Sequence, residues 1–181
     1  MPREVRVRQQ DLKEREISGF IKTLIVEFLE VFLHQTAFLK QVYPDSIYCT
    51  RRKYSIPVMM SEHPLVNQYI RTVTETFRAN LSHLNTVEVV FSRAGPLCQK
   101  VRLEFLKIKS LKSSCSFDLK ETLELTFASL LLRLAEIMKE QRRKEKGEVE
   151  WKVVTRAGQR KKGERPAVAF NKPFKRTVPL L

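Results

Sequence analysis

The most constraining feature of this sequence is the segment of residues 14–42, whose apolar pattern predicts one long helix. Apolar side chains recur at helical spacing over residues 17–32, and a second apolar set at residues 26–38 lies on another side of the same helix. A helix that is apolar over most of its circumference has to be buried on several sides. The sequence therefore predicts a central helix that ends at Tyr43-Pro44, with the other elements packed around it.

Two further helices and three strands are predicted from the remaining sequence, after an extended segment. Pro64 opens a helix, because the N–H that proline lacks would have no partner in a first helical turn. Asp118 opens another helix in a capping-box pattern. Residues 86–91 are rich in β-branched side chains, and residues 99–105 and 148–154 alternate between apolar and polar, which predicts strands. Strands that follow each other as a hairpin, covered by helices on one face, make an α+β domain.

Positive charge is concentrated in the C-terminal quarter of the chain. Residues 139–181 contain 14 Lys or Arg and 5 Asp or Glu, a net charge of +9 out of a total of +14. Such a segment is typical of a solvated tail or of one that faces nucleic acid, and not of a core element. We therefore expect weak, sequence-independent DNA binding by this tail, and nuclear localisation directed by its Lys/Arg clusters.

No motif for catalysis or metal binding stands out. The sequence has no H-E-x-x-H, C-x-x-C or G-x-S-x-G pattern, and its three cysteines lack metal-ligand spacing. His34 lies within the apolar helix and is interpreted as a buried core histidine, and His63 precedes Pro64 and is interpreted as a helix cap. The sequence predicts a binding module and not an enzyme, with no cofactor and no metal. Without a signal peptide or a membrane-spanning run, an intracellular protein with no membrane partner is expected.

A series of short motifs between residues 20 and 72 is similar to a known family. These motifs are Glu27-Phe-Leu-Glu-Val31, Val42-Tyr-Pro44, Arg52-Lys-Tyr54, Pro57-Val58, His63-Pro64 and Asn67-Gln-Tyr-Ile70. In this order and without large gaps, they resemble the HORMA-domain accessory subunit of translesion DNA polymerase zeta, in the mitotic-arrest-deficient-like adaptor family. Over residues 86–156 the resemblance is limited to pattern and element order, and beyond residue 157 it is poor.

The resemblance implies a HORMA fold, with three helices packed on a three-stranded antiparallel sheet in residues 1–156. A C-terminal seatbelt follows, here the basic residues 157–181. In that family the seatbelt wraps an extended, proline-containing peptide of a partner against the domain. The resemblance implies that Tyr69, the tyrosine of the Asn-Gln-Tyr-Ile motif, contacts this peptide at the edge of a groove. The helical pattern alone predicts a tyrosine at the edge of the core, and an aromatic ring with a polar tip at such an edge suits that role.

The resemblance also implies a function and partners. It implies a non-catalytic adaptor in DNA damage tolerance and repair, whose client is the catalytic subunit of polymerase zeta. Further implied partners are the deoxycytidyl-transferase scaffold of translesion synthesis and an AAA+ remodeller that opens the closed form. In some lineages the family also serves double-strand-break repair choice and cell-cycle control.

The tail and one helix position depart from the family. The tail after Arg156 is shorter than the family's seatbelt and lacks its tryptophan, since Trp151 lies in the predicted third strand. We expect a shortened or truncated seatbelt that crosses to the far edge of the sheet. Residues 167–170 are the only part of it suited to an edge strand. We also expect such a short seatbelt to release its client quickly. The family uses an arginine of its third helix to pair with another HORMA protein, and this position aligns near Ala128 here. Dimerisation by that route is therefore left open.

Two other functions fit the same sequence. One is a spindle-checkpoint or meiotic HORMA protein, which has the same fold and a different peptide client. The other is a basic nucleic-acid-binding protein that works through its tail.

Overall fold

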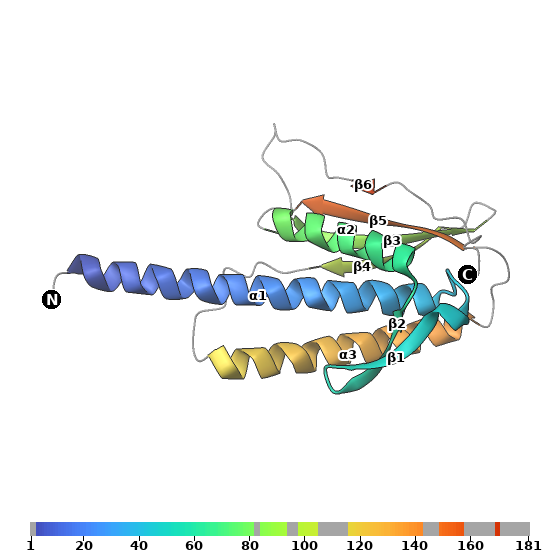
Figure 1. Ribbon diagram of the computed structural model, residues 1–181, viewed down its shortest axis with the longest axis horizontal. Coiled ribbons are helices and arrows are strands. Elements are labelled where there is room, and N and C mark those ends of the chain that lie inside the picture. Colours follow the sequence, from blue (N-terminus) through green and yellow to red (C-terminus); the bar gives the residue numbers. More distant parts are fainter. Residues whose placement is uncertain are drawn as a thin grey trace.

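The computed structural model describes residues 3–81, 84–93, 98–104, 116–142, 149–157 and 169–170. Its three helices are α1 (Arg3–Leu39), α2 (Pro64–Asn80) and α3 (Ser116–Arg142). Figure 1 shows α1 in the middle of the molecule, with α2 and the larger sheet on one side and α3 on the other. The predicted α+β arrangement of three helices with antiparallel strands is confirmed.

The central position of α1 follows from its apolar residues. Phe28 and Leu29 are almost fully buried on different sides of the helix, and Phe28 stacks on Phe127 of α3 with ring centroids 4.2 Å apart. The helix begins at Arg3, well before the predicted start. Its first residues are mainly Arg, Lys, Gln and Glu, which favour a helix but form no apolar stripe, so periodicity alone could not find them.

The C-terminus of α1 corrects the sequence prediction. The helix ends at Leu39 and not at Tyr43-Pro44. Gln41 takes a left-handed conformation with φ 52°, while the Val42 N–H donates to Ala37 O at 3.0 Å and the Gln41 N–H to Phe38 O at 2.9 Å. This pair of bonds is a Schellman motif, which usually has glycine at the left-handed position. Because Gln41 stands there, no residue type marks the helix end.

The predicted extended segment is a β-hairpin. β1 (Tyr48–Lys53) pairs antiparallel with β2 (Ile56–Ser61), and a short 3-10 turn at Asp45–Ile47 precedes them. The two turn residues, Tyr54 and Ser55, have φ values of 50° and 61°. A two-residue hairpin turn with two positive φ values normally carries Asn or Gly, and the absence of both explains why sequence analysis missed the hairpin.

The larger sheet has the strand order β4-β3-β5-β6, and all its pairs are antiparallel. β3 (Leu84–Arg93), β4 (Cys98–Glu104) and β5 (Val149–Ala157) are the three predicted strands. Alternate residues of these strands form one apolar face against the core: Val87, Val89, Phe91, Val101, Leu103, Val149, Trp151 and Val153. The period-2 pattern in the sequence thus placed the sheet correctly.

A fourth strand, β6 (Ala169–Phe170), falls within the predicted segment 167–170 but lies at a different edge from the one expected. It pairs with β5, where Val153 lies opposite Phe170, and not with the far edge formed by β4. The rest of the tail beyond β5 lies outside the described residues, so a seatbelt is not among the elements described. Among the described helices, none combines the length and apolarity needed to cross a membrane.

Candidate functional site

Tyr69 is held on α2 by a well-defined helix start. The His63 side chain caps the helix, because its Nδ1 accepts a hydrogen bond from the Leu65 N–H at 3.3 Å, and Pro64 is the first helical residue. The predicted capping role of His63 is therefore confirmed. From this start the helical period turns Val66 and Ile70 into the core and leaves Tyr69 half-buried at its edge.

Tyr69 is one of four aromatic side chains that pack together, and we call them the aromatic cluster: Tyr43, Tyr69, Phe91 and Trp151. The ring of Tyr69 lies edge-on to Trp151 at 5.4 Å, and Trp151 lies parallel to Phe91 at 6.4 Å. The Trp151 indole N–H donates to the Tyr43 hydroxyl at 3.1 Å. The cluster joins the segment that follows α1, the first half of α2 and two strands of the sheet. It gives Tyr69 a rigid apolar support, as an anchoring side chain needs.

The hydroxyl end of Tyr69 lies beside the backbone of β5. Burial raises the pKa of Tyr69 to about 12, and the nearby backbone of Val153 opposes this shift. Val153 is also the residue of β5 that pairs with Phe170 of β6. Tyr69 therefore marks the point where α2 meets the outer edge of the sheet. Within the described residues, β6 pairs with only Val153 and Val154 of this edge.

The family motif indicated Tyr69, but no motif indicated the residues that support it. Trp151 was predicted only as a strand residue, and Tyr43 only as the end of a helix. Their meeting depends on a contact between residues 108 positions apart, which no local pattern reveals. The alternation in residues 148–154 did indicate which side Trp151 faces, and that was the available signal.

His34 has the predicted role of a satisfied core histidine. It is buried, and its Nδ1 accepts a hydrogen bond from the Ser61 N–H at 3.2 Å. The neighbouring Gln35 accepts a hydrogen bond from the Met59 N–H at 2.8 Å. Burial lowers the pKa of His34 to about 4, which keeps the imidazole neutral and able to accept. These two side chains fasten β2 to α1.

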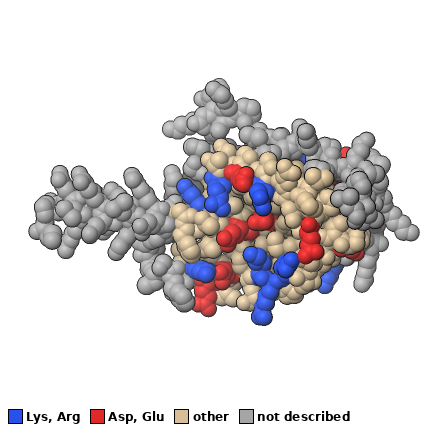
Figure 2. Space-filling view, in the orientation of Figure 1, with Lys and Arg blue, Asp and Glu red and all other residues tan. Residues whose placement is uncertain are grey.

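The three cations that precede the hairpin turn are exposed on β1. Arg51 pairs with Glu62 at 3.0 Å, and both side chains are about 60% exposed, so the pair adds little stability. On the face shown in Figure 2, Lys and Arg lie among Asp and Glu, with no large area of one sign. Within the part of the chain described, no three His, Cys, Asp or Glu side chains gather closely enough to hold a metal ion.

Comparison with known proteins supports the family that the motifs indicated. The chain is 35% identical over 82 residues to mitotic spindle assembly checkpoint protein MAD2B of Bos taurus and of Homo sapiens. It is 40% identical over 63 residues to MAD2B of Danio rerio. This chain is a distant homologue of MAD2B. The similarity to the bovine and human MAD2B covers 45% of this chain and 37% of those proteins, and no family model matches the chain.

The fold agrees with the homology to MAD2B. A chain in a crystal structure of the mitotic checkpoint complex superposes with a TM-score of 0.63, covering 80% of this chain and 75% of that one. At 16% identity this similarity shows the fold alone. The MAD2B family is non-catalytic, which supports the prediction that this chain is not an enzyme.

Proposed function

We propose that this chain is a non-catalytic adaptor that captures an extended, proline-containing peptide beside Tyr69. The position of Tyr69 carries this proposal, because its half-buried ring rests on Trp151 and its hydroxyl lies next to the backbone of β5. Aromatic side chains at such positions bind proline-containing segments, whose extended form is already present before binding. The homology to MAD2B favours a peptide-binding role of this kind.

The edge of β5 supplies the second half of the proposed site. An extended peptide gains affinity from main-chain hydrogen bonds to a strand edge and specificity from side-chain contacts. β6 takes up only two residues of that edge within the described chain. A peptide that binds at Tyr69 therefore either displaces β6 or continues past it along β5.

The client we propose is the catalytic subunit of translesion DNA polymerase zeta. The support is the ordered motif set that includes Tyr69, together with the homology to MAD2B. The deoxycytidyl-transferase scaffold and an AAA+ remodeller are the further partners of this proposal, and the nucleus is the compartment. DNA damage tolerance is then the process in which the adaptor acts.

A checkpoint role is the second candidate, and a specific observation favours it. The homologous protein is named a mitotic spindle assembly checkpoint protein, and the fold matches a chain of the mitotic checkpoint complex. In that case the same edge and the same tyrosine would hold a checkpoint client.

Peptide binding by fluorescence anisotropy separates these candidates. One labelled peptide is the proline-containing segment of the polymerase zeta catalytic subunit, and the other is the client segment of a spindle-checkpoint HORMA protein. The adaptor proposal predicts at least about tenfold tighter binding of the first, or about 1.4 kcal/mol. Tighter binding of the second would support the checkpoint role, and binding of neither would contradict peptide capture.

A further inference from the structure

The outer edge of β1 presents backbone groups that β2 does not use. In an antiparallel pair, alternate residues bond to the partner strand and the others point away from it. The Glu62 N–H donates to Ile47 O at 2.8 Å, which makes Ile47 and Glu62 a bonded pair. Bonded pairs repeat at every second residue, so Arg51, which lies opposite Val58, also bonds to β2. This alternation directs the N–H and C=O groups of Thr50 and Arg52 outward.

The opposite edge of the hairpin is already satisfied. The outward N–H groups of β2, from Met59 and Ser61, donate to Gln35 and His34 of α1. The hairpin therefore has one edge fastened to the helix and one edge open. In the residues described, no strand pairs with the outer side of β1.

The hairpin is held rigidly enough to act as a template. Tyr54 and Ser55 both take positive φ values, a backbone conformation that residues other than glycine adopt at a cost in free energy. Tyr54 packs on Phe127 at 5.4 Å and on Phe28 at 6.3 Å, which fixes the turn against α1 and α3. A preformed edge loses little conformational entropy when an extended segment binds to it.

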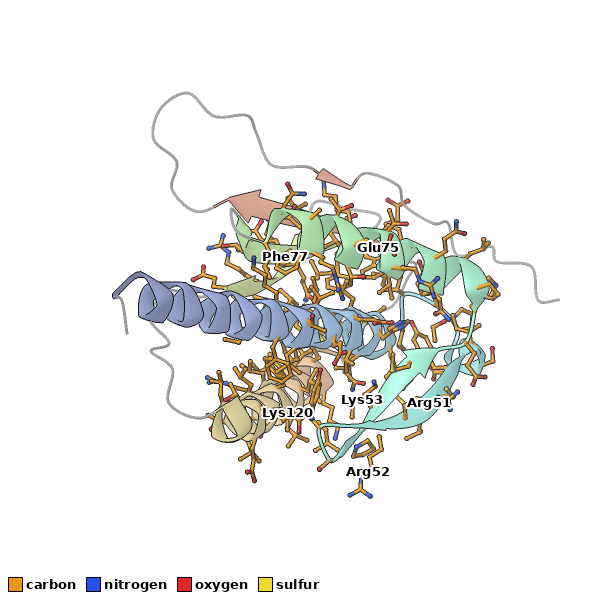
Figure 3. All side chains as sticks on the ribbon, turned by 60° about the vertical axis from the view of Figure 1, so that its left-hand side comes forward. Arg51, Arg52, Lys53, Glu75, Phe77 and Lys120 are labelled. Atoms are coloured by element: carbon orange, nitrogen blue, oxygen red, sulfur yellow. The ribbon has the colours of Figure 1, made fainter. Side chains whose placement is uncertain are left out.

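The charge of this edge is positive. Thr50, Arg51, Arg52 and Lys53 are all exposed, and Figure 3 shows Arg52 projecting away from the helices. Arg51 is paired with Glu62, whereas Arg52 and Lys53 form no ion pair within the described part of the chain. Cations on an open edge discourage pairing with a second copy, because like charges would then face each other. The same cations favour an acidic segment.

We propose that the outer edge of β1 binds an extended acidic segment of a partner protein, which adds to the hairpin as a third strand. The site is separate from the one at Tyr69, since it lies on the other sheet and uses Thr50 and Arg52. Main-chain bonds along β1 give the binding, and Arg52 and Lys53 select for acidic side chains.

A capped seven-residue peptide of alternating glutamate and valine, labelled with fluorescein, serves as the probe. It is titrated with the full chain at about 0.15 M salt, where long-range attraction is screened. Thr50→Pro removes one outward N–H and leaves the bonds between β1 and β2 intact, so we expect at least about tenfold weaker binding. Thr50→Val keeps the backbone group and should bind as the parent does. A peptide N-methylated at alternate residues should also fail to bind.

The charge contribution is tested with the double variant Arg52→Gln/Lys53→Gln, for which binding should fall several-fold. The control Arg71→Gln removes an exposed cation from α2 and should change nothing, as should Tyr69→Ala. Equal binding by Thr50→Pro with an unchanged melting temperature would overturn the proposal. A lack of peptide binding to the parent protein would also overturn it. So would displacement of the peptide by duplex DNA to the same extent in the parent and in every variant, because the peptide would then bind a general cationic surface.

Discussion

Trp151 of β5 donates its indole N–H to the hydroxyl of Tyr43 at 3.1 Å, and both side chains are almost completely buried. This bond ties the segment that follows α1 to the strand nearest the proposed peptide site. Burial raises the pKa of Tyr43, and the bond from Trp151 opposes that shift. The same indole supports the ring of Tyr69, so stability and binding depend on one side chain.

Replacing Trp151 by phenylalanine should destabilise the fold, because it leaves the Tyr43 hydroxyl buried without its donor. We expect a loss of about 1–3 kcal/mol in the free energy of unfolding by urea. In Tyr43→Phe the hydroxyl is absent, so adding Trp151→Phe to that variant should cost about 1 kcal/mol less than it does alone. Costs that add without coupling would mean that the bond contributes nothing.

Lowering the pH should destabilise the protein, because the buried His34 resists protonation in the folded state. Its folded pKa of about 4 lies below the unfolded value of 6.5, so the unfolded state takes up the proton first as the pH falls. The stabilising effect is complete above pH 6.5 and is lost as the pH falls from 6.5 towards 4, by up to about 3 kcal/mol. Urea unfolding at several pH values measures this loss. His34→Gln should flatten the profile between pH 6.5 and 4, whereas His63→Asn should leave it in place; the same slope in His34→Gln and the parent would exclude His34 as its source.

Gln41→Gly should stabilise the protein. Gln41 holds a φ of 52° in the Schellman motif that ends α1, and glycine adopts this conformation without steric strain. The expected gain is about 0.5–1 kcal/mol in thermal or urea unfolding. Gln41→Ala is the matched control and should bring no gain, because alanine keeps the Cβ that causes the strain.

The basic tail should bind DNA weakly and without sequence preference. Phosphate contacts release counterions, so affinity for a duplex should fall steeply as salt rises. Deleting residues 158–181 should flatten this dependence, measured by anisotropy between about 50 and 200 mM salt. If the truncated chain keeps the full salt dependence, the DNA contacts lie elsewhere.

The sequence was most informative where a single element decides the outcome. The two-sided apolar pattern of α1, the alternation in β3, β4 and β5, and the His63-Pro64 start of α2 all predicted local structure that the fold contains. Each of these signals comes from residues close together in the chain. The prediction of Tyr69 as a contact residue came from the family motif and stays a prediction.

The features that sequence analysis missed depend on strain or on distant contacts. Gln41, Tyr54 and Ser55 take positive φ values that their residue types do not indicate. The pairing of β6 with β5 instead of β4, and the pairing of Tyr43 with Trp151, both depend on the packing of the whole domain. None of these leaves a periodic trace in the sequence.

The most direct test of the account is the affinity of Tyr69→Ala for the proline-containing peptide of the polymerase zeta catalytic subunit, measured by calorimetry. We predict a loss of about 2 kcal/mol or more, which is about thirtyfold, because the variant removes an anchor at the edge of the sheet. Tyr69→Phe keeps the ring and should lose only a small part of the affinity. Unchanged affinity in Tyr69→Ala, with a normal melting temperature, would contradict the assignment of the peptide site to Tyr69.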